Sequence, residues 1–144
     1  MVDLQGVVRA FGLAPANCDE RPIGDALIAV DHHDAYYLAD KGFSSVGWER
    51  RWLEVYGALV AATPKANSRR AWPEADRRWA SGKRQLIEQV ISQLKDLFSL
   101  VRHRAKTLDG LLARLAAKVA AYTYGQLLNV RLGRPLRHLA DLLV

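Results

Sequence analysis

The chain has 144 residues, of which 50% are hydrophobic and 25% are charged, and its formal net charge is +6. This balance is typical of a folded domain with one core and excludes a chain that is disordered throughout. A single cysteine excludes an intramolecular disulfide and fits the cytosol. The first residues lack the pattern of a signal peptide, and no apolar run approaches the roughly 18 residues of a membrane-spanning helix.

The two halves of the chain carry opposite net charges. Residues 1–60 hold 5 Lys or Arg and 9 Asp or Glu, whereas residues 61–144 hold 16 and 6. The acidic half is suited to binding a metal ion, and the basic half is suited to binding the phosphates of a nucleic acid. The alternative is that both are ordinary solvated surfaces of a basic protein.

The first half of the chain predicts short strands that alternate with helices. A turn at Gly6 divides residues 2–13 into two extended pieces, and Asn17 or Asp19 is expected to cap the first helix. In chain order, the elements that follow are a helix over residues 22–30, a buried central strand over 35–39, a helix over 46–56 and a strand over 58–62. Gly57 is expected to end the second of these helices.

The second half predicts a basic segment and two long helices. Residues 65–84 contain few aliphatic side chains and are expected to form a loop with a short helical piece. Apolar residues at spacings of three and four predict an amphipathic helix over residues 82–101 and a final helix over 107–131. Strands that alternate with helices favour a partly parallel sheet with helices packed on it.

Two acidic residues are candidates for chemistry. Asp40 is expected where a strand ends, and a carboxylate there is well placed to hold a hard cation; the alternative is an ordinary turn-forming aspartate. Glu88 is expected on the same polar helix face as Arg84 and Lys95, because it follows the first by four residues and precedes the second by seven. The alternative for Glu88 is a solvated helix face with a surface ion pair worth only ~0.3–0.5 kcal/mol.

Taken together, the two motifs resemble the transposase DDE domain of bacterial insertion sequences, a ribonuclease H-like family. Residues 38–43 read L-A-D-K-G-F, and the family places its second acid in an A-D-K-G-Y/F motif at a strand end. Residues 84–95 match the R-x-x-x-E-x-x-x-x-x-x-K part of the signature that holds the third acid, although Ser81 stands where tyrosine is usual. The resemblance covers almost the whole chain, and residues 6–21 are similar to the family's strand and A-N-x-D/H-D/E segment.

The resemblance implies an α/β fold with a ribonuclease H-like mixed sheet, flanking helices and long C-terminal helices. It implies that residues 1–144 are the C-terminal part of the catalytic domain, truncated at the N-terminus, so that the first strand and its aspartate are missing. The implied parts are a strand-rich part with the second acid (1–64), a basic loop (65–84) and a helical part with the third acid (85–144). Asp3 is the only nearby substitute for the first acid, and a turn between two extended pieces explains that residue as well.

In this family, three carboxylates hold two Mg²⁺ or Mn²⁺ ions that assist DNA hydrolysis and strand transfer. The resemblance therefore implies that Asp40 and Glu88 are catalytic metal ligands. It also implies a set of basic residues that contact DNA phosphates, namely Lys65, Arg69, Arg70, Arg77, Arg78, Lys83, Arg84 and Lys95. The implied partners are the DNA of transposon ends and target, and either further copies of this chain or a full-length transposase. The implied location is the bacterial cytoplasm, at the nucleoid when bound to DNA, with no membrane partner.

Several other side chains allow two interpretations each. Trp72 and Trp79 lie in the basic segment, where they either stack on a displaced base or pack beneath the loop. The adjacent His32 and His33 suggest a metal pair, but a solvated turn explains them too. His103 and the later His138 are expected on the surface of basic helical stretches.

Two functions follow from the resemblance. The first is a transposase that cleaves and joins DNA, in which this chain alone is inactive because it supplies two acids of three. The second is a catalytically inactive DNA-binding protein, or a transposase remnant that inhibits an active copy.

Overall fold

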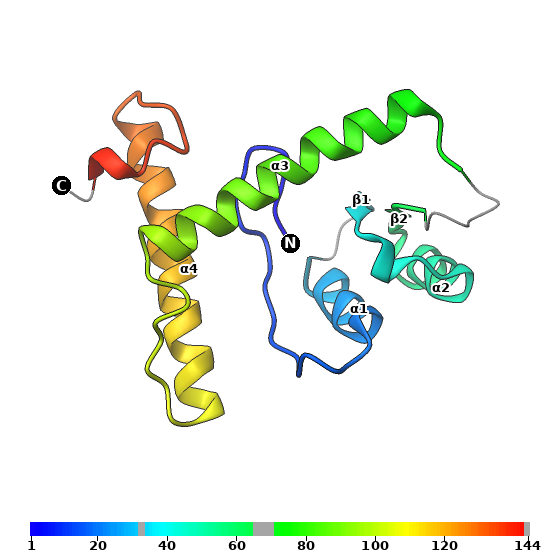
Figure 1. Cartoon of the computed structure of the whole chain (residues 1–144), viewed down its shortest axis with the longest axis horizontal. Helices are drawn as coiled ribbons and strands as arrows, with labels where there is room; N and C mark the ends of the chain where they lie inside the picture. Colours follow the sequence, from blue (N-terminus) through cyan, green and yellow to red (C-terminus); the bar gives the residue numbers. More distant parts are fainter. Residues whose placement is uncertain (32–33, 65–70, 143–144) are drawn as a thin grey trace. The chain divides into compact units, whose positions relative to one another are not determined.

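The computed structural model describes residues 1–31, 34–64 and 71–142. In chain order, the elements of these residues are α1 (Glu20–Asp31), β1 (Tyr36–Ala39), the 3-10 helix η1 (Lys41–Phe43), α2 (Val46–Tyr56), β2 (Leu59–Ala62), α3 (Glu74–Asp96), α4 (Leu108–Arg131) and the 3-10 helix η2 (Ala140–Leu142) (Figure 1). The chain forms two compact units. We call them the strand unit, which comprises Met1 and Ala10–Gly82, and the helical unit, which comprises Val2–Arg9 and Lys83–Val144.

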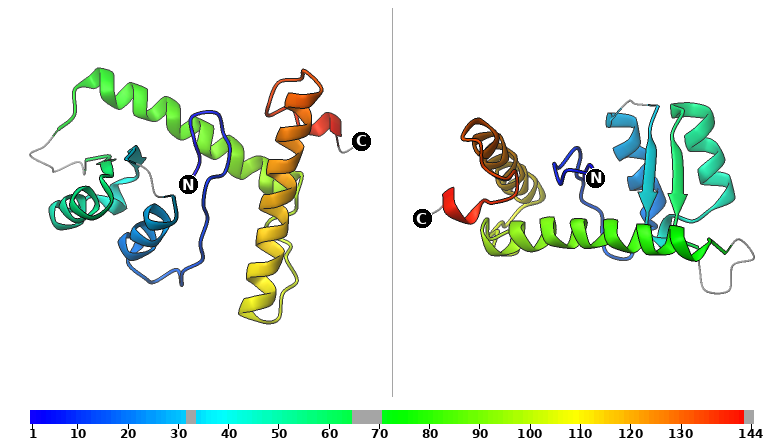
Figure 2. Two further views of the ribbon diagram at one scale, coloured as in Figure 1. Left: turned by 180° about the vertical axis from the view of Figure 1, so that it is seen from behind. Right: turned by 90° about the horizontal axis from the view of Figure 1, so that it is seen from above.

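The strand unit is built around a parallel pair of strands. Tyr36 of β1 lies opposite Leu59 of β2, and Ala39 lies opposite Ala62. Figure 2, seen from above, shows the two strands side by side and pointing the same way. Parallel neighbours require a crossover connection, which η1 and α2 supply here. The predicted α/β architecture with parallel pairing is therefore confirmed at this level.

Local sequence signals fix the ends of α1 and α2. The Asp19 carboxylate accepts the backbone N–H of Arg21 at 3.0 Å, so Asp19 rather than Asn17 caps α1. Gly57 ends α2 with φ 64°, and its N–H donates to Leu53 O at 3.0 Å. The positive φ favours glycine at this position, and a Cβ there would displace the Asp34 carboxylate, whose Oδ1 would lie 1.9 Å away.

The core of the strand unit centres on Trp52, which is fully buried with Ile28 and Ala58. The strands are less covered than the apolar run predicts, because Tyr36 is 87% exposed and the rest of β1 is only half-buried. The prediction of a buried central strand is therefore wrong for the described part of the chain. An apolar run does not reveal whether other elements cover both faces of a strand.

The helical unit packs α3 and α4 against the turn near the N-terminus. Val90 and Leu94 of α3 form its buried core with Tyr122 of α4 and Leu139. Val2 pairs with Val8 in one antiparallel bridge, and the turn between them places Gly6 at φ 92°. The Gln126 amide donates to Gly6 O at 2.9 Å, and the Tyr122 hydroxyl contacts Gln93 Oε1 at 3.1 Å. The predicted extended pieces around Gly6 thus appear as a bridged turn.

The final helix α4 is close to its predicted bounds, whereas α3 is not. The Thr107 hydroxyl accepts the N–H of Gly110 at 3.1 Å and caps α4. Helix α3 begins at Glu74 and ends at Asp96, so residues 74–84 are helical rather than loop, and Val101 lies beyond the helix. No helix among the described residues has the length and apolarity needed to cross a membrane.

Candidate metal-binding acids and DNA-binding residues

Asp40 lies where the sequence predicts, directly after the last residue of β1. Its carboxylate accepts the backbone N–H of Lys41 at 2.7 Å and so caps the short helix η1. The Thr63 N–H donates to Ala39 O at 3.0 Å, which holds the end of β2 beside the end of β1. An exposed carboxylate at the C-terminal end of a parallel strand is the usual position for a ligand-binding group in an α/β protein.

The turn after Asp40 lies close to a second acid that the sequence did not single out. A Cβ at Gly42 would lie 2.2 Å from Glu20 Oε2, so the Glu20 carboxylate lies against this glycine. A side chain at this position would displace the carboxylate of Glu20, the first residue of α1. Glu20 belongs to the segment that resembles the family's A-N-x-D/H-D/E motif, and this was the one sequence signal for it.

Glu88 lies on the predicted helix, in the middle of α3. Arg84 Nε donates to Glu88 Oε1 at 3.1 Å, and both side chains are more than half exposed, at 66% and 62%. Lys95 is exposed seven residues further along the helix. Separations of four and seven residues place all three on one face, roughly opposite the buried Val90. The predicted helix and shared polar face are confirmed.

The two acids belong to different units, Asp40 to the strand unit and Glu88 to the helical unit. Among residues 1–31, 34–64 and 71–142, no group of three or more His, Cys, Asp or Glu side chains is arranged to hold a metal ion. The metal-ligand roles of Asp40 and Glu88 rest on the sequence motifs.

The predicted DNA-binding residues within the described chain all lie on α3. Arg77, Arg78 and Arg84 are exposed along this helix. Arg78 also donates to Glu74 Oε1 at 2.8 Å, an exposed pair one helical turn apart. Three further predicted contacts lie outside the described residues, namely Lys65, Arg69 and Arg70. The sequence predicted Arg77 and Arg78 in a loop with a short helical piece, whereas both residues lie in α3.

The two tryptophans of the basic segment differ in their surroundings. Trp72 is half-buried and lines a cavity of about 440 Å³ with Ser45, Glu49 and Pro64. Trp79 is 55% exposed on α3, and its stacking on a displaced base stays a prediction.

Asp3 acts as a turn residue. Its Oδ1 accepts the backbone N–H groups of Gln5 and Val7, each at 2.9 Å, and thereby stabilises the turn around Gly6. His103 is a half-buried loop residue rather than part of a helix, so its expected position is wrong. The paired His32 and His33 lie outside the described residues.

Comparison with known families agrees with the motifs. The family model described as transposase DDE domain matches residues 1–124, a range that contains both Asp40 and Glu88. Comparisons with curated proteins and with solved structures gave no match. Because the matched range covers most of the 144 residues, the chain belongs to the transposase DDE domain family.

Proposed function

We propose that the chain takes part in the metal-dependent cleavage and strand transfer of DNA during transposition of an insertion sequence. The observation that carries the proposal is the position of Asp40, at the exposed end of a parallel strand in a member of the transposase DDE domain family. Glu88 adds the second acid, on an exposed α3 face that it shares with Arg84 and Lys95. The wider ribonuclease H-like sheet is part of the same proposal, and the β1–β2 pair is compatible with it.

The proposed metal ligands have the right chemistry for Mg²⁺ or Mn²⁺. Asp40 and Glu88 are both exposed carboxylates, and hard divalent cations prefer oxygen ligands. When bound, such cations stabilise the attacking and leaving oxygens of a phosphodiester exchange. The oxygen atoms of these residues are therefore suitable ligands for the ion. The chain supplies two of the three acids that the family resemblance implies.

The basic side chains of α3 would bind the DNA and orient the Glu88 carboxylate. Arg84 holds the Glu88 carboxylate through a hydrogen bond of 3.1 Å and thus restricts the directions in which that carboxylate can point. Lys95 and the arginines of α3 would contact phosphates of the bound DNA, since Arg forms bidentate contacts and Lys acts as a compact point charge. Lys65, Arg69 and Arg70 extend the proposed DNA-binding set into the preceding segment.

Taken alone, the 144-residue chain is proposed to bind DNA without cutting it. The resemblance assigns the first acid to a strand ahead of these residues, and Asp3 already accepts two backbone N–H groups in a turn. Two carboxylates without a third should hold two cations poorly. A chain that binds DNA but does not cut it would also compete with an active transposase for its DNA sites, and would thereby inhibit that transposase.

A plasmid-nicking assay tests this proposal. The purified chain, Asp40→Ala and Glu88→Ala would be incubated with supercoiled DNA and Mg²⁺ or Mn²⁺, and DNA binding would be measured in parallel. We expect all three proteins to bind DNA and none to nick it. Metal-dependent nicking that is lost in both variants would show a complete metal site and refute the inactivity of the chain alone.

Two other outcomes bear on the proposal. Nicking that survives both substitutions would exclude Asp40 and Glu88 as its source. If the unmodified chain does not bind DNA at moderate salt, the role in DNA transposition is itself contradicted for this chain.

A further inference from the structure

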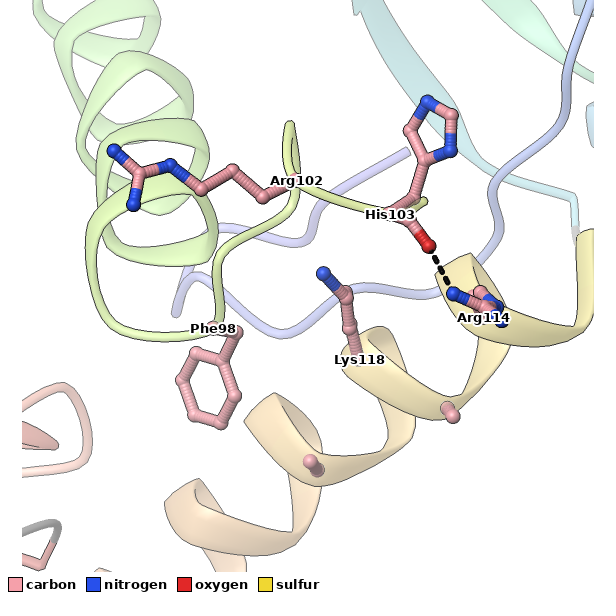
Figure 3. Close-up of a pocket in the computed structure, with 7 residues that line it drawn as sticks. Phe98, Arg102, His103, Arg114 and Lys118 are labelled. Atoms are coloured by element: carbon pink, nitrogen blue, oxygen red, sulfur yellow. Dashed lines mark hydrogen bonds between the residues drawn. The ribbon is translucent and has the colours of Figure 1, made fainter. Parts of the chain in front are cut away.

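A basic pocket lies between the loop after α3 and the first half of α4. It is an open pocket of about 380 Å³, and its lining includes Phe98, Arg102, His103, Arg114 and Lys118. Figure 3 shows Lys118 rising from α4 toward the loop that carries Arg102 and His103. Four of these five side chains are basic, and all belong to the helical unit.

Cations of α4 hold the loop in place. The Arg114 guanidinium donates to His103 O (Figure 3), and the Lys118 ammonium donates to Ser99 O. The loop contains two non-glycine residues in the left-handed region, Ser99 with φ 50° and Arg104 with φ 51°. A left-handed backbone is unfavourable for both residues, so the contacts from α4 help to hold the loop in this conformation.

Most hydrogen-bond donors of the pocket remain available to a ligand. A lysine ammonium has three donors and an arginine guanidinium has five, whereas Lys118 and Arg114 each donate one hydrogen bond to the loop. The His103 ring accepts the Ala105 N–H through Nδ1 at 3.1 Å, so a neutral ring carries its proton on Nε2. No acidic side chain in the described part of the chain forms an ion pair with Arg102, Arg114 or Lys118.

The surrounding charge favours an anion in this pocket. Residues 83–144 hold 11 Lys or Arg and only 4 Asp or Glu. A group of unneutralised cations with several open donors attracts a phosphate strongly, and Arg and Lys supply most protein contacts to the DNA backbone. Free phosphate has the same chemistry as a backbone phosphate, so the two sources have to be separated by experiment.

We propose that this pocket binds a phosphate of the DNA backbone, as a contact separate from the basic face of α3. The proposal rests on the proposed DNA-binding function and adds a site to it. Arg102 and Lys118 would contact the phosphate oxygens, while Arg114 positions the loop through His103 O. Neither Arg102 nor Lys118 belongs to the DNA-binding set that the sequence predicts.

The salt dependence of DNA binding by the whole chain tests this site. Affinity for a labelled duplex would be measured by fluorescence anisotropy over a range of salt concentrations, for the unmodified chain, Arg102→Gln, Lys118→Gln and Lys118→Arg. Each lost phosphate contact lowers the slope of log affinity against log salt by about 0.9, equivalent to roughly 8-fold in affinity at ~0.1 M salt. We expect this loss for both glutamine variants and a retained slope for Lys118→Arg.

Arg131→Gln is the matched control, because it removes one positive charge from the far end of the same helix. Arg131 lies 17 residues after Arg114 in α4, or about 25 Å along the helix axis at ~1.5 Å per residue. Thermal melting of each variant identifies any loss due to unfolding. Arg102→Gln is the cleaner test because the Arg102 side chain forms no hydrogen bond or ion pair with the residues that the structure describes, and its backbone N–H, which donates to Ser99 O, is kept in the variant. Equal slopes for Arg102→Gln and Arg131→Gln would overturn the proposal.

The remaining outcomes separate this site from the proposed function. If the unmodified chain does not bind DNA, both the pocket and the DNA-binding function fail. If it binds DNA and the pocket variants keep the full slope, the pocket alone fails. Amide chemical shifts of Ser99 and Arg102 should saturate with duplex DNA well before they do with inorganic phosphate at the same phosphate concentration. The reverse order would identify a small-anion site and contradict the proposal.

Discussion

Replacement of Arg77, Arg84 and Lys95 together by glutamine is expected to weaken duplex DNA binding by on the order of 100-fold or more at ~0.1 M salt. All three side chains are exposed on α3, and their separations of seven and eleven residues place them on one helical face. A helix holds its cations in register with one another better than a loop does, so each can neutralise a phosphate. The slope of log affinity against log salt should fall by about 2.7 for three lost contacts.

A triple variant with the same charge change provides the control. Lys106→Gln, Arg131→Gln and Arg134→Gln remove three exposed cations that lie outside α3. We expect this control to lose only a small part of the affinity and of the slope. Similar losses for the two triple variants would mean that DNA binding follows overall charge, and the α3 face would then lose its assigned role.

Trp52→Ala is expected to lower the free energy of unfolding of the strand unit by about 3–5 kcal/mol. Trp52 is fully buried, and its ring centroid lies 5.7 Å from that of Trp48. Its removal leaves a cavity beside Ile28 and Ala58 that the small core cannot refill. A loss of this size is a large part of the 5–15 kcal/mol that is typical of a whole domain.

Urea unfolding monitored by circular dichroism measures this loss. Trp52→Phe is the matched control, because it keeps most of the apolar volume and removes an indole N–H for which no partner is found among the described residues. We expect Trp52→Phe to cost much less than Trp52→Ala. A cost below ~1 kcal/mol for Trp52→Ala would show that this tryptophan is not the centre of the core.

Elements with strong local signals could be predicted from the sequence. Helix α2 has its predicted bounds because Gly57 takes a left-handed conformation that ends it. Helix α4 begins one residue from its predicted start because Thr107 provides a side-chain cap. Signals of this kind operate within a few residues, so they do not depend on the rest of the fold.

The start of α3 and the exposure of β1 could not be predicted in this way. Residues 74–84 contain few aliphatic side chains, so they lack the hydrophobic period that predicts a helix. Their helix is instead supported by acidic residues in the first turn and by the ion pair between Glu74 and Arg78. The exposure of Tyr36 depends on which elements cover the sheet, and the sequence of the strand does not indicate those elements.

The candidate sites also differ in whether the sequence alone predicts them. Asp40 at a strand end and Glu88 beside Arg84 follow from short motifs, and the structure places both on the predicted elements. The basic pocket depends on a loop with two left-handed residues and on cations from α4, which are brought together only by folding. No spacing in the sequence indicates that Arg102 and Lys118 line one cavity.

Broadening of backbone amide signals by Mn²⁺ tests most directly whether Asp40 is a metal ligand. Mn²⁺ would be added to the isotope-labelled chain, to Asp40→Asn and to Glu54→Gln, a control that removes an exposed acid of α2. We expect the amide signals of Ala39 and Lys41, on either side of Asp40, to weaken early in the titration of the unmodified chain and of Glu54→Gln. The same signals should keep their intensity in Asp40→Asn. If the broadening around Asp40 persists in Asp40→Asn, this carboxylate does not hold the metal ion and the account is contradicted.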